Sequence, residues 1–167
     1  YNAASHSFTL DPSAAAYQHL AAGATQVVSV SYGVSDGTAT TPASVSWTVT
    51  GTNDVPVVSG AVSGGATEDG VAVTLDALAN ASDPDAGTTL LVVDVPPSLP
   101  AGVSYNAASH SFTLDPSAAA YQHLAAGATQ VVSVSYGVSD GTATTPASVS
   151  WTVTGTNDVP VVSGAVS

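Results

Sequence analysis

The chain has 167 residues, 44% of them hydrophobic, and its 12 Asp and Glu side chains meet no Lys or Arg, giving a net charge of −12. A polyanion of this kind excludes nucleic acid and anionic membrane surfaces as electrostatic partners. Cys is absent, so no disulfide supports the fold, and no stretch approaches the ~20 apolar residues that membrane insertion requires.

The sequence repeats itself. Residues 1–63 recur letter for letter as residues 105–167, a shift of 104 residues that matches the size of an independent domain. We therefore expect residues 1–55 to be the C-terminal part of one repeat, 56–159 a complete repeat, and 160–167 the start of the next. Because residues 1–55 lack the counterparts of 64–104, we expect them either to pack against a segment outside this chain or to belong to a longer chain of which this sequence is a part.

Within the complete repeat, strands are predicted first at 57–62, 71–75, 89–95 and 109–114, where apolar residues alternate or cluster between Gly, Pro and Asp. Residues 116–124 carry helix signals, with Asp115 as a cap, Pro116 at the first position and Gly127 beyond the end.

The two longest predicted strands, 130–138 and 147–154, alternate regularly and are joined through Asp140-Gly141, a strong hairpin signal. Trp151, and Trp47 in the first copy, fall on the apolar face and are predicted to be core residues rather than sugar-stacking ones. About seven short strands predict an all-β, immunoglobulin-like sandwich with one short helical turn, and a jelly roll is the alternative.

The sequence also resembles a known family. YxxLAAGAT, VSDGTA and WTVTGTNDVPVVSG are similar to the VCBS and cadherin-like repeats of giant bacterial RTX adhesins. Near-identical copies of this length look like the extender region of an ice-binding RTX adhesin from a polar marine bacterium. The resemblance implies a Greek-key sandwich with calcium near the domain junctions, on an extracellular protein of the bacterial surface that projects a distal binding domain.

The residues independently favour calcium. Calcium takes six to eight hard oxygens from carboxylates, amides and carbonyls, and this chain offers such groups in its loops, without the Cys that zinc favours. Strand directions predict that Asn53 and Asp54 of the linker, the Asp83-Pro84-Asp85 loop and the hairpin Asp140 converge at one end of the repeat. The expected ligands are Asn53, Asp54, Glu68, Asp69, Asp83, Asp85, Asp36, Asp140, Asn157 and Asp158.

Structural alternatives exist for several of these residues. Asp36 and Asp140 are also typical turn formers, and the Asn-Asp linkers could form Asx-turns. Asp115 is expected to cap the helical turn, and His110 and His123 to be surface or half-buried residues. Glu68 and Asp69 are expected at the other end of the repeat, near Asn157 and Asp158.

No catalytic motif is present: there is no G-x-S-x-G, no H-E-x-x-H and no glycine-rich phosphate loop. A hydrolase that uses Asp83 and Asp85 lacks an aromatic cleft to hold its substrate. The sequence therefore predicts a calcium-stabilised spacer whose partners are neighbouring identical repeats, without a small-molecule substrate. A calcium-dependent carbohydrate- or ice-binding module is the alternative.

Overall fold

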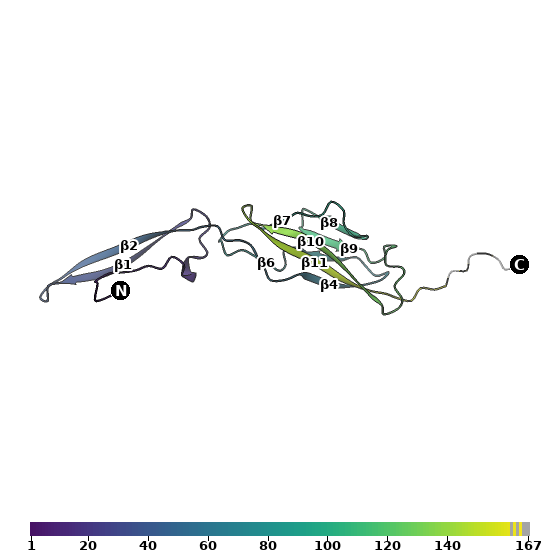
Figure 1. The fold of residues 1–167 in the computed structure, drawn as a ribbon, viewed down its shortest axis with the longest axis horizontal. Coiled ribbons are helices and arrows are strands. Elements are labelled where there is room, and N and C mark those ends of the chain that lie inside the picture. Colours follow the sequence, from purple (N-terminus) through teal and green to yellow (C-terminus); the bar gives the residue numbers. More distant parts are fainter. Residues whose placement is uncertain (161, 163, 165–167) are drawn as a thin grey trace. The chain divides into compact units, whose positions relative to one another are not determined.

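The computed structural model describes residues 1–160, 162 and 164, and it is an all-β structure (Figure 1). The chain forms two compact units: Tyr1–Val55 with Asp83–Thr89, and Pro56–Ser82 with Leu90–Ser167. The expected start of a further repeat at 160–167 lies mostly outside the described residues. No helix among the described residues is long and apolar enough to cross a membrane.

A four-stranded sheet forms one layer of the second unit. Its order is β4 (Val62–Thr67), β11 (Thr144–Thr154), β10 (Thr129–Ser139) and β7 (Leu91–Val93). The β10–β11 hairpin is antiparallel, as the alternation and the Asp-Gly turn predict, whereas β4 pairs with β11 in parallel. This parallel pairing joins segments far apart in sequence, and no local pattern indicates it.

The opposing layer is smaller. It consists of β5 (Val73–Asp76), β9 (Ser111–Leu114) and β8 (Val103–Asn106), with β9 in the middle, and β3 (Val57–Val58) pairs separately with β6 (Ala81–Ser82). The predicted strands are present with shifted ends, while β6, β8 and all of β4 beyond Val62 were not predicted. The immunoglobulin-like sandwich expected from the sequence is confirmed.

The core lies between these layers. Trp151, Val149 and Val153 of β11 and Phe112 and Leu114 of β9 are all fully buried. Burial of this apolar surface is the main favourable term in folding.

Polar groups in the core find backbone acceptors. Trp151 donates its Nε1–H to the Val73 carbonyl at 3.2 Å, and the Tyr136 hydroxyl donates to the Ala77 carbonyl at 2.6 Å. Aromatic packing continues from Tyr136 through Phe112 to Tyr105, with ring centroids 5.2 and 4.7 Å apart. These contacts tie the two layers together at defined positions.

The first unit repeats only part of this arrangement. Its β1 (Thr25–Ser35) and β2 (Thr40–Thr50) form a two-stranded hairpin in the same register as β10 and β11. Tyr1, Phe8 and Tyr32 repeat the aromatic row of the second unit, with centroids 4.8 and 5.1 Å apart. The hairpin therefore keeps its register with only part of the opposing layer packed on it.

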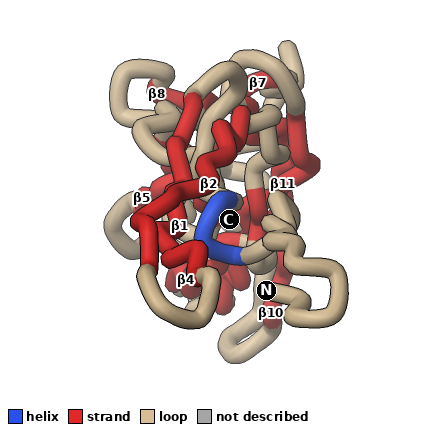
Figure 2. Tube along the Cα trace, turned by 90° about the vertical axis from the view of Figure 1, so that its left-hand side faces the viewer, coloured by secondary structure: helices blue, strands red, loops and turns tan. Residues whose placement is uncertain are grey.

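The helix expected at 116–124 is not formed. The segment is a chain of turns, with bonds from the Tyr121 amide to the Ala118 carbonyl and from the Leu124 amide to the Tyr121 carbonyl. Tyr121 and Leu124 are both buried, so the segment follows the core instead of winding regularly. In the first copy a three-residue 3-10 helix, η1 (Ala15–Tyr17), forms in the equivalent segment (blue in Figure 2).

Candidate metal centre

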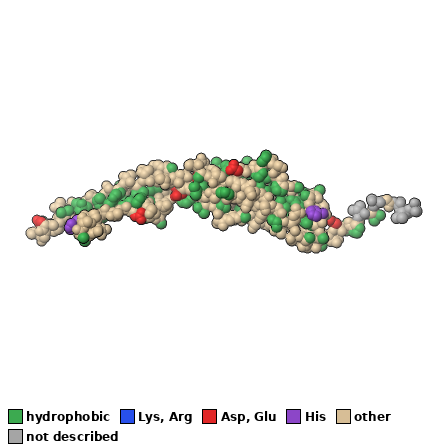
Figure 3. Space-filling view, in the orientation of Figure 1, with side chains coloured by type: hydrophobic (Ala, Val, Ile, Leu, Met, Phe, Trp, Pro, Cys, Tyr) green, Lys and Arg blue, Asp and Glu red, His purple; other side chains and the backbone are tan. Residues whose placement is uncertain are grey.

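Three carboxylates each bury one oxygen that has no hydrogen-bond partner. Among the described side chains, Glu68 Oε1, Asp83 Oδ2 and Asp85 Oδ1 are the buried oxygen or nitrogen atoms in this state. A buried, unpaired carboxylate oxygen is costly, and Figure 3 shows scattered acidic side chains on a surface without Lys or Arg. Such atoms point to a partner that the protein does not itself provide.

Glu68 follows β4 directly and is 1% exposed. Its backbone N–H donates to the Thr154 carbonyl at 2.9 Å, which extends the parallel pairing of β4 with β11 by one residue. Its Oε2 accepts a hydrogen bond from the Thr156 N–H at 2.8 Å. Glu68 is therefore held beside the linker that leaves the repeat, with Oε1 still unpaired.

Asp83 and Asp85 belong to the loop that packs in the first unit. The Asp85 N–H donates to Asp83 Oδ1 at 2.8 Å, and Asp85 Oδ2 accepts from the Asp54 N–H at 2.9 Å. The Ala86 N–H also donates to the His19 carbonyl at 3.0 Å. The structure thus brings Asp54, Asp83 and Asp85 together, with one oxygen of each loop carboxylate bonded and the other unpaired.

The two linkers share a local geometry. The Asn53 side-chain amide donates to the Asp54 carbonyl at 2.8 Å, and that of Asn157 donates to the Asp158 carbonyl at 3.1 Å. Asn157 and Asp158 are exposed and lie two residues or fewer from Thr156, which binds Glu68. Glu68, Asn157 and Asp158 therefore lie at the same end of the second unit, as the strand directions predict.

The hairpin acids act as turn residues in the structure. Asp36 Oδ1 accepts the Thr38 and Ala39 amides at 2.8 Å each, and Asp140 Oδ1 accepts the Thr142 and Ala143 amides at 2.6 Å each. The hydrogen bonds from the Ala39 and Thr38 amides lower the pKa of Asp36. The expected convergence of Asp140 with Asn53, Asp54, Asp83 and Asp85 stays a prediction.

Asp69 and Asp115 have their own partners. Asp69 Oδ1 accepts from the Gln122 side-chain amide at 2.8 Å and adopts a φ of 62°. Asp115 Oδ1 accepts from the Ser117 hydroxyl and amide, which lowers its pKa, so it caps a turn rather than a helix.

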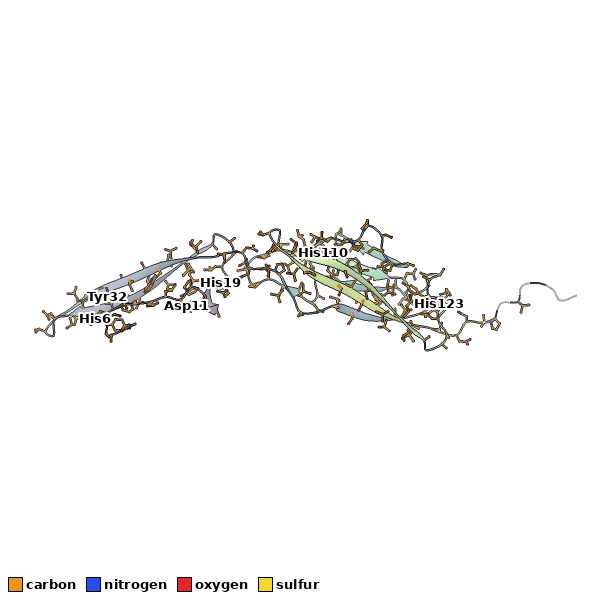
Figure 4. The ribbon with its side chains drawn as sticks, in the orientation of Figure 1. His6, Asp11, His19, Tyr32, His110 and His123 are labelled. Atoms are coloured by element: carbon orange, nitrogen blue, oxygen red, sulfur yellow. The ribbon has the colours of Figure 1, made fainter. Side chains whose placement is uncertain are left out.

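The histidines do not converge on the acids. Figure 4 shows His6 and His19 on separate segments of the first unit, and His110 and His123 on separate segments of the second. Among the described residues, no group of three or more His, Cys, Asp or Glu side chains is close enough to hold a metal ion. Each unit therefore holds an incomplete set of acidic ligands: Asp54, Asp83 and Asp85 in the first unit, and Glu68 beside Asn157 and Asp158 in the second.

These partial sets fit calcium in their chemistry. Buried carboxylate oxygens, Asn side chains and loop carbonyls are the hard donors that calcium prefers. A divalent cation would compensate the unpaired oxygens of Glu68, Asp83 and Asp85 in a chain that has no basic side chain of its own. Of the described contacts, the Thr156 amide was not predicted, because a backbone donor has no sequence signature.

The sequence model of a family described as "Cadherin-like domain" matches residues 52–154. A search of curated proteins finds no match.

Among solved structures, the chain is similar to protocadherin gamma B2 (19% identity, TM-score 0.48, 81% of this chain and 27% of that chain). It is also similar to an endo-fucoidan hydrolase of glycoside hydrolase family 107 (17%, 0.42, 84% and 20%) and human protocadherin-24 (19%, 0.41, 80% and 67%). The chain thus spans about a quarter or less of the length of the first two structures.

Proposed function

The chain belongs to the cadherin-like domain family, and we propose that it is a calcium-stabilised spacer of an extracellular bacterial adhesin. The observation that carries the proposal is the set of three buried, half-bonded carboxylates at the ends of the repeat. In a chain without Lys and Arg, a bound cation would compensate their buried charge.

Sequence identity between the copies supports a shared junction. Thr156 corresponds to Thr52, and Asp158 corresponds to Asp54, since the two linkers are identical. One linker binds Glu68 through its Thr amide, and the other binds Asp85 through its Asp amide. In an array of identical repeats, each linker would therefore carry both bonds.

Such a junction would be completed by two repeats. The preceding repeat would contribute a Glu68 equivalent, the linker would contribute its Asn and Asp, and the following repeat would contribute its Asp83 and Asp85 equivalents. Calcium would neutralise these carboxylates and hold them in one coordination sphere. The protein's own residues orient the carboxylates through backbone amides, which fixes which oxygens remain available.

The consequence is mechanical rather than catalytic. Without calcium, like charges at each linker would repel, so adjacent repeats would swing. With calcium, their relative orientation would be fixed. A chain of near-identical copies would then serve to set the reach of an adhesin, including adhesins of the RTX and ice-binding type that the sequence resembles.

Calcium titration tests the proposal. The melting temperature of the chain should rise with calcium and return to its starting value with EDTA, since an ion that binds only the native state stabilises it by RT ln(1 + [L]/Kd). Small-angle scattering on a tandem of complete repeats should show a larger and better defined maximum dimension in calcium. The variant with both Asp83→Ala and Asp85→Ala should keep the calcium-free profile at that junction.

The two measurements separate two claims. If the melting temperature is the same with calcium and with EDTA, the proposal that the chain binds calcium is wrong. A raised melting temperature with an unchanged maximum dimension would leave calcium as a stabiliser and remove its role in setting the reach of the array.

A further inference from the structure

One loop of the complete repeat packs with the first unit. By sequence, residues 83–89 lie inside the complete repeat, yet by their contacts they belong with Tyr1–Val55. Ser82 and Leu90, on either side of the loop, belong to the second unit. Asp85 in this loop is only 5% exposed. We call residues 83–89 the arm, because the chain leaves its own unit to form this contact.

The tip of the arm is a tight turn over residues 85–88. The Thr88 N–H donates to the Asp85 carbonyl at 3.4 Å, and Gly87 has a φ of 83°, the positive value that the third residue of a type II turn requires. The second residue of such a turn does not use its own N–H for the turn's hydrogen bond. The Ala86 N–H can therefore donate to an acceptor outside the arm.

Two hydrogen bonds hold the arm on the first unit. The Ala86 N–H donates to the His19 carbonyl at 3.0 Å, and the Asp54 N–H donates to Asp85 Oδ2 at 2.9 Å. Within the arm, the Asp85 N–H donates to Asp83 Oδ1 at 2.8 Å and orients the two carboxylates. All of these donors and acceptors are protein atoms, so the contact itself contains no role for a metal ion.

The acceptor that receives the arm lies on a loop that is itself fastened. Leu20, which follows the His19 labelled in Figure 4, is 9% exposed, and its N–H donates to the Tyr17 carbonyl at 3.1 Å. A Cβ on Gly51 would clash with the Leu20 carbonyl oxygen, so the end of the long hairpin passes directly against this loop. The His19 carbonyl is thereby presented to the arm at a defined position.

We propose that residues 83–89 form a docking arm, which belongs by sequence to one repeat and is held by hydrogen bonds on the copy that precedes it. The Ala86 amide anchors the arm, and the Asp85 carboxylate is its second point of attachment. The arm stays docked in the absence of calcium. A consequence, which rests on the proposed calcium role, is that Ala86 positions the carboxylates of Asp83 and Asp85 beside the linker without being a ligand itself.

Amide hydrogen exchange of the full chain in EDTA tests the arm directly. The Ala86 amide should have a protection factor at least about 10-fold above that of the Gly87 amide, because the arm must open before Ala86 exchanges. Gly87 is the internal control, since its N–H donates to no described residue. Both amides belong to one turn, so a turn that forms without docking would protect neither of them.

Two variants at one position test the anchor. Ala86→Pro removes the donor and keeps the turn, because proline is favoured at the second position of a type II turn. In EDTA this variant should lower the protection factor of the Asp54 amide, which donates to Asp85, roughly 10-fold. Ala86→Ser is the matched control, since the exposed side chain changes while the N–H is retained. The Gly51 amide, which donates to the Ala24 carbonyl at 2.8 Å, should stay protected in every chain and reports that the first unit is folded.

Calorimetric titration of calcium separates the arm from the proposed calcium role. Ala86→Pro should weaken calcium binding roughly 10-fold relative to Ala86→Ser, because residues that orient metal ligands affect affinity without touching the ion. Equal calcium affinity of the two variants would remove the positioning role of Ala86. If no chain binds calcium, the proposed function fails, and the exchange data in EDTA still decide whether the arm is docked.

Two results would overturn the docking arm. Equal protection of the Ala86 and Gly87 amides in EDTA would show that the arm is not held on the first unit. An unchanged Asp54 amide in Ala86→Pro, with Gly51 still protected, would show that Ala86 is not the anchor. If Ala86→Pro unfolds the first unit, the comparison of Ala86 with Gly87 in the parent chain decides alone.

Discussion

At the residue scale, Glu68 uses its two carboxylate oxygens differently. One carboxylate oxygen is bonded to the Thr156 amide while the other is buried and unpaired. The same division holds for Asp83 and Asp85, which bond through one oxygen each. Each side chain is therefore held in place by backbone amides, and its unpaired buried oxygen is a cost to the folded protein that a bound cation would offset.

Glu68→Gln should have opposite effects in the two conditions. In EDTA the amide removes a buried charge and keeps an acceptor for the Thr156 amide, so the free energy of unfolding should rise by roughly 1–3 kcal/mol. In calcium the stabilisation should be reduced, because a carboxylate ligand is lost. Thermal and urea denaturation in both conditions measure the two effects.

Asp94→Asn is the matched control for Glu68→Gln. It also removes one negative charge, but Asp94 is exposed and has a φ of 54°, which Asn tolerates. It should leave the calcium response unchanged. If Asp94→Asn and Glu68→Gln alter the response equally, net charge rather than the buried oxygen is responsible.

Tyr136 makes the stability sensitive to alkaline pH. Burial, followed by the negative charge of Asp76 and the neighbouring Tyr105, raises the pKa of Tyr136 to about 12. In the unfolded chain a tyrosine titrates near pH ~10, so the native state holds the proton more tightly. The stabilisation is complete below pH ~10 and is lost as the pH rises from there through about 12.

Tyr136→Phe should therefore lose less stability than the parent chain between pH 8 and pH 11. At pH 8 it should be less stable by about 1–2 kcal/mol, because the buried Ala77 carbonyl loses its donor. Tyr32→Phe, at the exposed counterpart of Tyr136, should change neither the stability at pH 8 nor its loss between pH 8 and pH 11. An undiminished alkaline loss in Tyr136→Phe would assign the titration to other groups.

At the scale of the elements, the end of the long hairpin requires glycine. A Cβ on Gly155 would lie 2.5 Å from the Ala125 carbonyl oxygen and 2.6 Å from that of Leu124. Gly155 also exchanges backbone bonds with this loop, donating to Ala128 and accepting from Gly127. The loop after the turn segment is thereby fastened to the last strand just before the linker.

Gly155→Ala should destabilise the repeat by about 1–3 kcal/mol, because backbone atoms must move to admit the methyl group. Gly65→Ala is the control, since it lies within β4 with nothing within 4 Å of its Cβ position, and it should be neutral or slightly stabilising. Urea denaturation of each variant gives the comparison. Equal stability of the two variants would contradict the close approach seen at Gly155.

At the scale of the whole molecule, the proposed calcium junction requires residues from two successive repeats. In the chain as given, the linker at Asn53 lacks a preceding Glu68 equivalent, and the linker at Asn157 lacks a following Asp83–Asp85 pair. Two complete repeats in tandem contain both sides of one junction. Affinity should therefore increase when the second repeat is added, because more charged ligands surround one site.

Isothermal titration of calcium into one repeat and into two repeats tests this expectation. The tandem should show a class of tighter sites that is absent from the single repeat and that Glu68→Gln in the first repeat abolishes. Sites of equal affinity, doubled in number, would place calcium within each repeat rather than at the junction.

Local interactions explain what could be predicted from the sequence. Alternation along 130–138 and 147–154, with Asp140-Gly141 between them, predicted the long hairpin because side-chain period and turn chemistry act over a few residues. The tandem repeats could be predicted because residues 1–63 are identical to residues 105–167. The meeting of Asp85 with the Asp54 linker, and of Glu68 with the exit linker, also followed from strand directions.

Long-range contacts decided the rest. The parallel pairing of β4 with β11, and the unwinding of 116–124 into turns around Tyr121, depend on partners distant in sequence. The orphaned oxygens of Glu68 and Asp85 depend on which backbone amides reach them. Val30 and Val134 have identical sequence neighbours, yet one is exposed and the other buried, because residues 56–104 cover only the second. Sequence determined the pattern of the strand, and the packing of the opposite layer decided its burial.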